Sequence, residues 1–120
     1  NDAAASNIKS TKKYSNKINL PKFVRKNFKY DDDKDLYTYS KIIDDENIKL
    51  EYNSELGKLF VNKNSKKYPV DYSSNILTFF DFDEITHNNV LFDVENNECI
   101  SNNCADFINV INELKNMLKK

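Results

Sequence analysis

The sequence is poor in glycine, proline, histidine and cysteine, and it has no tryptophan. Its 120 residues include one Gly, two Pro, one His and two Cys. A phosphate-binding loop or a dinucleotide fingerprint needs several glycines for close backbone approach, so one glycine excludes both. A structural zinc site needs four ligands, whereas Cys99, Cys104 and His87 supply only three, so we predict neither a metal nor any other cofactor.

Long apolar runs are also missing. No run approaches the ~20 apolar residues that a membrane-spanning helix requires, so we predict no integral membrane protein. No secretory segment is present, and the chain does not begin with Met. We therefore expect a processed or trimmed chain and lean towards a secreted or exported mature protein.

Aromatic residues and charge are what the sequence has instead. Eight Phe and seven Tyr compensate for a hydrophobic fraction of only 39%, because each aromatic side chain buries about 150–250 Å². Asn and Lys are the most abundant polar residues, which we attribute to an AT-rich genome. Residues 1–30 carry a net charge of +7 and residues 35–120 a net charge of −6. This asymmetry predicts a flexible basic arm over 1–19 before a single acidic domain over 20–120.

The domain begins with a short helical pattern. Leu20, Val24 and Phe28 recur at i, i+4 and i+8, and Pro21 suits a first helical position. We therefore predict a short basic helix over 20–30 that must pack on the rest of the domain.

Alternating segments separated by turn residues follow over residues 36–100. The strand candidates are LYTYSKII, NIKLEYN, KLFV, KYPVDY, ILTFFDF, VLFDV and a short CI. Turn signals every 8–12 residues are typical of an antiparallel meander. The C-terminus then returns to helical spacing, with one apolar stripe of Phe107, Val110, Ile111, Leu114, Met117 and Leu118. We predict an α+β fold: an antiparallel β-meander or small barrel of five to seven strands, capped by an amphipathic helix over about 104–119.

This order of elements resembles the small pleckstrin-homology-like domains. The run IKLEYNSELGKLFVNKNSKKYPVDYSSNILTFFDFDEI is similar to their strand core, and Tyr72, Ser73, Ile76 and Phe79 or Phe80 match a Y-S-x-I-x-x-F pattern with one extra residue. The resemblance covers about residues 36–118 at the level of the fold. It implies lipid-headgroup or peptide binding rather than catalysis. The acidic segment SKIIDDENIK between the first two strands argues against a lipid headgroup.

The two cysteines lie five residues apart at the predicted junction between the last strand and the helix. A disulfide between Cys99 and Cys104 is sterically feasible there and is our reading for an exported protein. In a reducing compartment we expect two inert thiols instead. A third reading makes Cys104 a nucleophile at a helix start with His87 as its base. The pair Asp81 and Asp83, two apart on a strand, offers a further acid–base candidate.

These observations favour a non-enzymatic protein-interaction module, such as an exported effector or adaptor, with another protein as its partner. We expect binding at an exposed sheet edge or face. The candidate binding residues are Tyr37, Tyr39, Tyr68, Tyr72, Lys22, Arg25 and Lys26. The first alternative is a small hydrolase-like enzyme that uses Cys104 with His87. The second is a binder of nucleic acid or of an anionic membrane surface through residues 9–29, and the acidic domain argues against nucleic acid.

Overall fold

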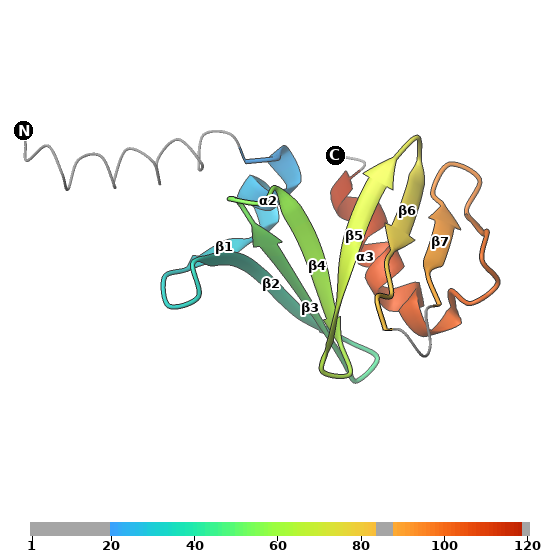
Figure 1. The fold of residues 1–120 in the computed structure, drawn as a ribbon, viewed down its shortest axis with the longest axis horizontal. Helices are drawn as coiled ribbons and strands as arrows, with labels where there is room; N and C mark the ends of the chain where they lie inside the picture. Colours follow the sequence, from blue (N-terminus) through green and yellow to red (C-terminus); the bar gives the residue numbers. More distant parts are fainter. Residues whose placement is uncertain (1–19, 84–87, 119–120) are drawn as a thin grey trace, which may run out of the picture.

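A computed structural model describes residues 20–83 and 88–118 and shows an α+β fold. Eight strands form one antiparallel sheet in which each strand pairs with its neighbours in sequence. The strands are β1 (Lys29–Asp31), β2 (Leu36–Ile43), β3 (Glu46–Asn53), β4 (Lys58–Lys63), β5 (Lys66–Ser73), β6 (Ile76–Phe79), β7 (Val90–Asp93) and β8 (Glu98–Cys99). The helices are α2 (Lys22–Asn27), the 3-10 turn η1 (Ala105–Phe107) and α3 (Ile108–Leu118). The predicted meander and C-terminal helix are therefore confirmed (Figure 1).

The sheet is open, because β1 and β8 form its two edges and do not pair with each other. A small barrel is therefore not what the structure shows. The predicted count of five to seven strands is also wrong, since there are eight. The additional strand is β1, whose first two residues fall within the predicted 20–30 helix. The helix ends at Asn27 because Lys29–Asp31 pair with β2 instead.

The turns explain why this sequence forms a meander. Three turns have two residues each, Asp44–Asp45, Asn64–Ser65 and Ser74–Asn75, and all six have positive φ angles. Positive φ at both positions defines the type I′ turn, whose twist matches that of the adjoining strands. Asn, Asp and Ser tolerate this conformation through their short polar side chains better than most residues, so the turns need no glycine.

The remaining tight turns share a sequence pattern that pattern reading missed. In each, the strand before the turn ends with an aromatic residue followed by Asp or Asn. The residue four positions after that Asp or Asn has a positive φ angle. The three copies are Tyr30–Asp31 with Asp35, Tyr52–Asn53 with Gly57, and Phe92–Asp93 with Asn97. In each copy the Asp or Asn side chain accepts backbone N–H groups of its own turn. These bonds close the turn and fix the register of the next strand.

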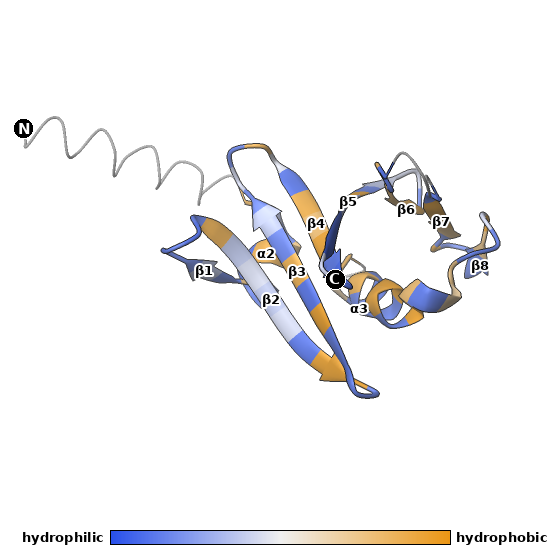
Figure 2. Ribbon diagram, turned by 60° about the horizontal axis from the view of Figure 1, so that its bottom comes forward, coloured by the Kyte–Doolittle hydropathy of each residue, from blue (hydrophilic) through white to orange (hydrophobic). Residues whose placement is uncertain are grey.

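Both helices pack on one face of the sheet and share one hydrophobic core with it. Figure 2 shows the C-terminal strands curling around α3, while β1 to β3 extend past it beside α2. Leu20, Val24 and Phe28 are all buried, as their spacing predicted. The α3 residues Val110, Ile111, Leu114 and Met117 are buried too. This arrangement leaves the opposite face of the sheet without a helix among the described residues.

A polar connection fixes the start of α3 on the sheet. Glu46 of β3 pairs with Lys63 of β4 at 2.6 Å and accepts a 3.0 Å hydrogen bond from Asn109 of α3. The hydrogen bond from Lys63 is the main cause that lowers the pKa of Glu46. Lys63 also lies 5.6 Å from the ring centre of Phe107. One carboxylate therefore joins two strands and the start of the helix.

The predicted basic arm, residues 1–19, lies outside the described residues, so its flexibility and its boundary with the domain stay predictions. Within residues 20–83 and 88–118, neither helix has the length and apolar character needed to cross a bilayer.

Candidate functional site: the free edge of strand β2

The longest unpaired strand edge among the described residues belongs to β2. Strand β1 pairs with Leu36, Tyr37 and Thr38 only, whereas β2 continues to Ile43. The chain before β1 turns away into α2 at Phe28, whose ring packs 5.8 Å from that of Tyr39. Figure 2 shows β1 beside only the first part of β2. The second half of β2 therefore has one strand neighbour, β3.

The geometry of the ladder determines which backbone groups this edge offers. In an antiparallel sheet, alternate residues turn their N–H and C=O groups towards opposite neighbours. Ile43 and Glu46 flank the two-residue turn and form the first hydrogen-bonded pair of β2 with β3. Counting back from that pair, Ser40 and Ile42 direct their backbone groups away from β3. The Ile42 residue is also 72% exposed. These two residues form a short template for an added strand.

A groove runs beside this edge on the helix-covered face of the sheet. Its volume is about 430 Å³. We call it the edge groove, and its walls are Lys26 and Asn27 of α2, Tyr39 and Lys41 of β2, and Glu113, Asn116 and Met117 of α3. A strand edge and a hollow along it provide the two things an extended peptide needs, which are backbone partners and room for alternate side chains.

Three of the residues that line the edge groove form a charged, hydrogen-bonded cluster. The Tyr39 hydroxyl donates a 2.7 Å hydrogen bond to Oε1 of Glu113, and Nζ of Lys41 lies 3.5 Å from Oε2. The Glu113 side chain is only 12% exposed. Burial, and then the bond to Glu113, raise the pKa of Tyr39 to about 12, so its phenol stays protonated at neutral pH. Lys26 is exposed and has no ion pair within residues 20–83 and 88–118.

The structure separates the four tyrosines that the sequence suggested as an exposed binding surface. Tyr37 is 8% exposed and belongs to the core, so its side chain offers little surface to a partner. Tyr39 and Tyr68 are partly buried against the core, where Tyr68 packs edge-on against Phe107. All three side chains point to the helix-covered face, because alternate residues of a strand share one face. Only Tyr72 is clearly exposed, at 39%.

The three basic candidate residues of α2 lie at the surface. Lys22, Arg25 and Lys26 are all exposed. They lie at i, i+3 and i+4, on one side of the helix, while Val24 faces the core. Lys26 also lines the edge groove, so the basic side of α2 borders it.

The cysteines form the predicted disulfide. Cys99 at the end of β8 is bonded to Cys104 just before η1, with Cα atoms 5.9 Å apart. Cys104 therefore carries no free thiol while the bond is intact. Its suggested base, His87, lies outside the described residues, so the pairing of the two remains an untested prediction. Among the described residues, no three His, Cys, Asp or Glu side chains gather in a way that could hold a metal ion.

Asp81, one of the two acid–base candidates, is buried and bonded to a lysine and to backbone groups. It is 4% exposed, and its carboxylate pairs with Lys66 at 2.7 Å and accepts the backbone N–H groups of Asp83 and Asn88. These contacts close the base of the loop between β6 and β7. Asp83 also lies 3.6 Å from Lys66. The two carboxylates therefore share one lysine, and Asp81 is held by backbone groups.

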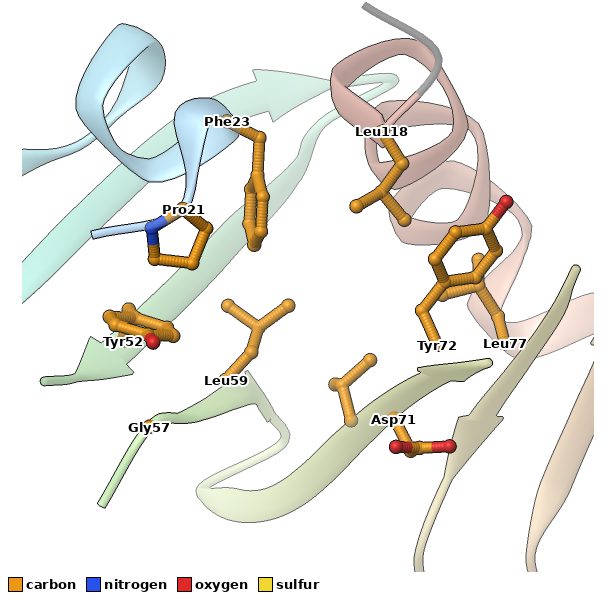
Figure 3. A pocket seen from close by; sticks show the side chains of 10 residues that line it. Pro21, Phe23, Tyr52, Gly57, Leu59, Asp71, Tyr72, Leu77 and Leu118 are labelled. Carbon is orange, nitrogen blue, oxygen red and sulfur yellow. The ribbon is translucent and has the colours of Figure 1, made fainter. Parts of the chain in front are cut away.

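A second hollow, of about 250 Å³, lies between the start of α2 and the end of α3 (Figure 3). Pro21 and Phe23 lie on one side, Leu118 on another, and Tyr52, Leu59 and Leu77 point into it from the sheet. It is mostly apolar and smaller than the roughly 300–1,000 Å³ typical of ligand sites. Because few polar groups converge on it, it provides little basis for specificity.

Sequence reasoning missed two parts of the edge groove. Glu113 was assigned no role, although it is the acceptor that orients Tyr39. Its position on α3 gives no signal, since its partner lies 74 residues earlier in the chain. The helical pattern over 20–30 also gives no sign of β1, and the point where β1 stops decides which half of β2 is unpaired. Comparisons of this chain with family models, with curated proteins and with solved structures found no match.

Proposed function

We propose that this protein is a non-enzymatic interaction module that binds an extended segment of another protein by adding it to the sheet beside β2. The observation that supports this most is the unpaired second half of β2 next to the edge groove. The bound segment would become a neighbour of Ser40 and Ile42 and take up their free backbone groups.

Edge strands in folded proteins are normally protected against such pairing. Here the two strands at the ends of the sheet, β1 and β8, are protected by their length, with three and two residues. The second half of β2 has no such protection. On the face opposite the helices, this half of β2 presents the exposed side chain of Ile42, a β-branched residue that favours strand pairing.

The test is a selection of short random peptides displayed on phage against the full chain. The comparison variant is Ile42→Pro, which removes the outward N–H group and leaves the bonds between β2 and β3 in place, because proline is tolerated on a free edge. Ile42→Val is the matched control, since it keeps the N–H group. We expect selected peptides to bind the wild type and Ile42→Val, and to bind Ile42→Pro roughly tenfold or more weakly.

Hydrogen exchange provides an independent measurement. A bound peptide should protect the backbone amides of Ser40 and Ile42, for which the described part of the chain provides no strand partner. Peptides that bind equally well to Ile42→Pro, or that leave both amides unprotected, would contradict strand addition. Thermal unfolding of each variant establishes that its fold is retained.

A further inference from the structure

We propose that the segment added beside β2 is acidic, with a carboxylate side chain facing the edge groove and an apolar β-branched or aromatic side chain opposite Ile42. This inference rests on the proposed function and specifies the chemistry of the partner.

Side-chain direction follows from the pairing geometry. Residues directly opposite each other in a sheet point to the same face. A partner residue opposite Lys41 would therefore face the edge groove, while a residue opposite Ser40 or Ile42 would face the other side. The partner must alternate accordingly, with a polar side chain beside Lys41 and an apolar one beside exposed Ile42.

The charges along the groove are predominantly basic. Lys26 and Lys41 line it, and Arg25 and Lys22 continue the basic side of α2. The groove contains one acid, Glu113, which already accepts a hydrogen bond from Tyr39 and lies 3.5 Å from Lys41. A carboxylate that enters would lie near Lys26 and share Lys41, and its desolvation would be offset by two cations.

The end of the edge limits where the carboxylate can lie. Asp44 and Asp45 form the exposed turn that follows Ile43. A second acidic residue opposite this turn would be repelled, so we expect a neutral or basic residue there. The groove therefore favours one carboxylate facing Lys41, followed by a neutral or basic end near the turn.

Charge also disfavours the other occupants of the edge. Residues 1–19 of the chain carry four lysines and one acid, so they match the sign of the groove. A second copy paired through its own β2 would bring a second Lys41 and a second basic α2 to the same place. An acidic segment of a different protein has the complementary sign.

The experiment uses three synthetic peptides that differ in one residue type. Each alternates Val with Thr and carries Glu, Gln or Lys in place of one central Thr, and binding to the full chain is measured by fluorescence anisotropy at low and at physiological salt. We expect the Glu peptide to bind roughly tenfold more tightly than the Gln peptide at low salt, and the Lys peptide to bind weakest. Added salt should narrow this difference, because partly exposed charges are screened.

Two double variants locate the effect. Lys26→Glu with Lys41→Glu should reverse the preference, so that the Lys peptide binds better than the Glu peptide. Lys34→Glu in the β1–β2 turn with Lys58→Glu at the start of β4 is the matched control, since it makes the same change in net charge at the other end of β2 and β3 and should keep the preference for Glu. Circular dichroism verifies the fold of both variants.

The other outcomes overturn the proposal and can be told apart. Equal affinity for all three peptides, still lost in Ile42→Pro, would refute the acidic partner and leave strand addition intact. Failure of all three peptides to bind would count against strand addition itself. A concentration-dependent dimer that disappears in Ile42→Pro would assign the edge to a second copy. Vesicles of anionic lipid that displace the Glu peptide would assign the lysines to a membrane surface.

Discussion

Reduction of the Cys99–Cys104 disulfide should lower the stability of the protein by an amount that its small loop determines. The two cysteines are five residues apart. Opening a loop of about five residues returns roughly 7 cal/mol/K of entropy to the unfolded chain, which is about 2 kcal/mol at room temperature. Reduction removes no side chain from the core, so this entropy is the main expected effect.

The assay is urea unfolding followed by circular dichroism, with and without a reductant. For a slope of about 2 kcal/mol/M, the midpoint should fall by about 1 M of urea. The double variant Cys99→Ser with Cys104→Ser should unfold near the reduced midpoint and should not respond to reductant. Mass measurement after alkylation verifies that the bond is present at the start. If the bond is verified and the midpoint moves by less than about 0.3 M, the entropy argument is refuted.

Two further predictions concern α3 and its contact with β2. Leu114→Ala should destabilise the protein by about 3 kcal/mol, because Leu114 is 0% exposed and its loss leaves a cavity. Urea unfolding measures this change. The control is Ile108→Ala, at an exposed position of the same helix, which should change the stability little. Tyr39 has a pKa of about 12 in the folded protein against its usual 10.0, so the protonated phenol stabilises the fold fully below pH 10 and this contribution is lost as the pH rises to about 12. The free energy of unfolding should therefore fall across that interval, and fall less in Tyr39→Phe; identical alkaline profiles for the two proteins would contradict the raised pKa.

Most of the sheet could be predicted from the sequence, because neighbouring residues alone indicate each strand and each turn. The strands alternate polar and apolar residues, and each two-residue turn contains Asp or Asn, which adopt positive φ more easily than most residues with a side chain. Strand β2 was predicted at Leu36–Ile43, the bounds that the structure shows. The stripe of α3 was equally clear, since its buried residues follow the helical period.

The first strand and the candidate site could not be predicted in this way. Lys29–Asp31 is too short to show a period, and its conformation is set by pairing with residues that come later in the chain. The free half of β2 follows from where β1 stops. The tyrosines were misplaced for a related reason: composition marks Tyr as a common interface residue, but the face of each strand that the helices cover decides its exposure.

The order of the strands also has a consequence for how the protein is made. Every strand of the sheet pairs with strands adjacent in sequence, so on the ribosome each new strand finds its partner already synthesised. Such local pairing is typical of rapid folding. The exception is α3, which covers the same face as the early strands but is synthesised after all eight strands. Until α3 emerges, the nascent chain exposes part of the apolar side of the sheet, and aggregation or a chaperone can act on it in that interval.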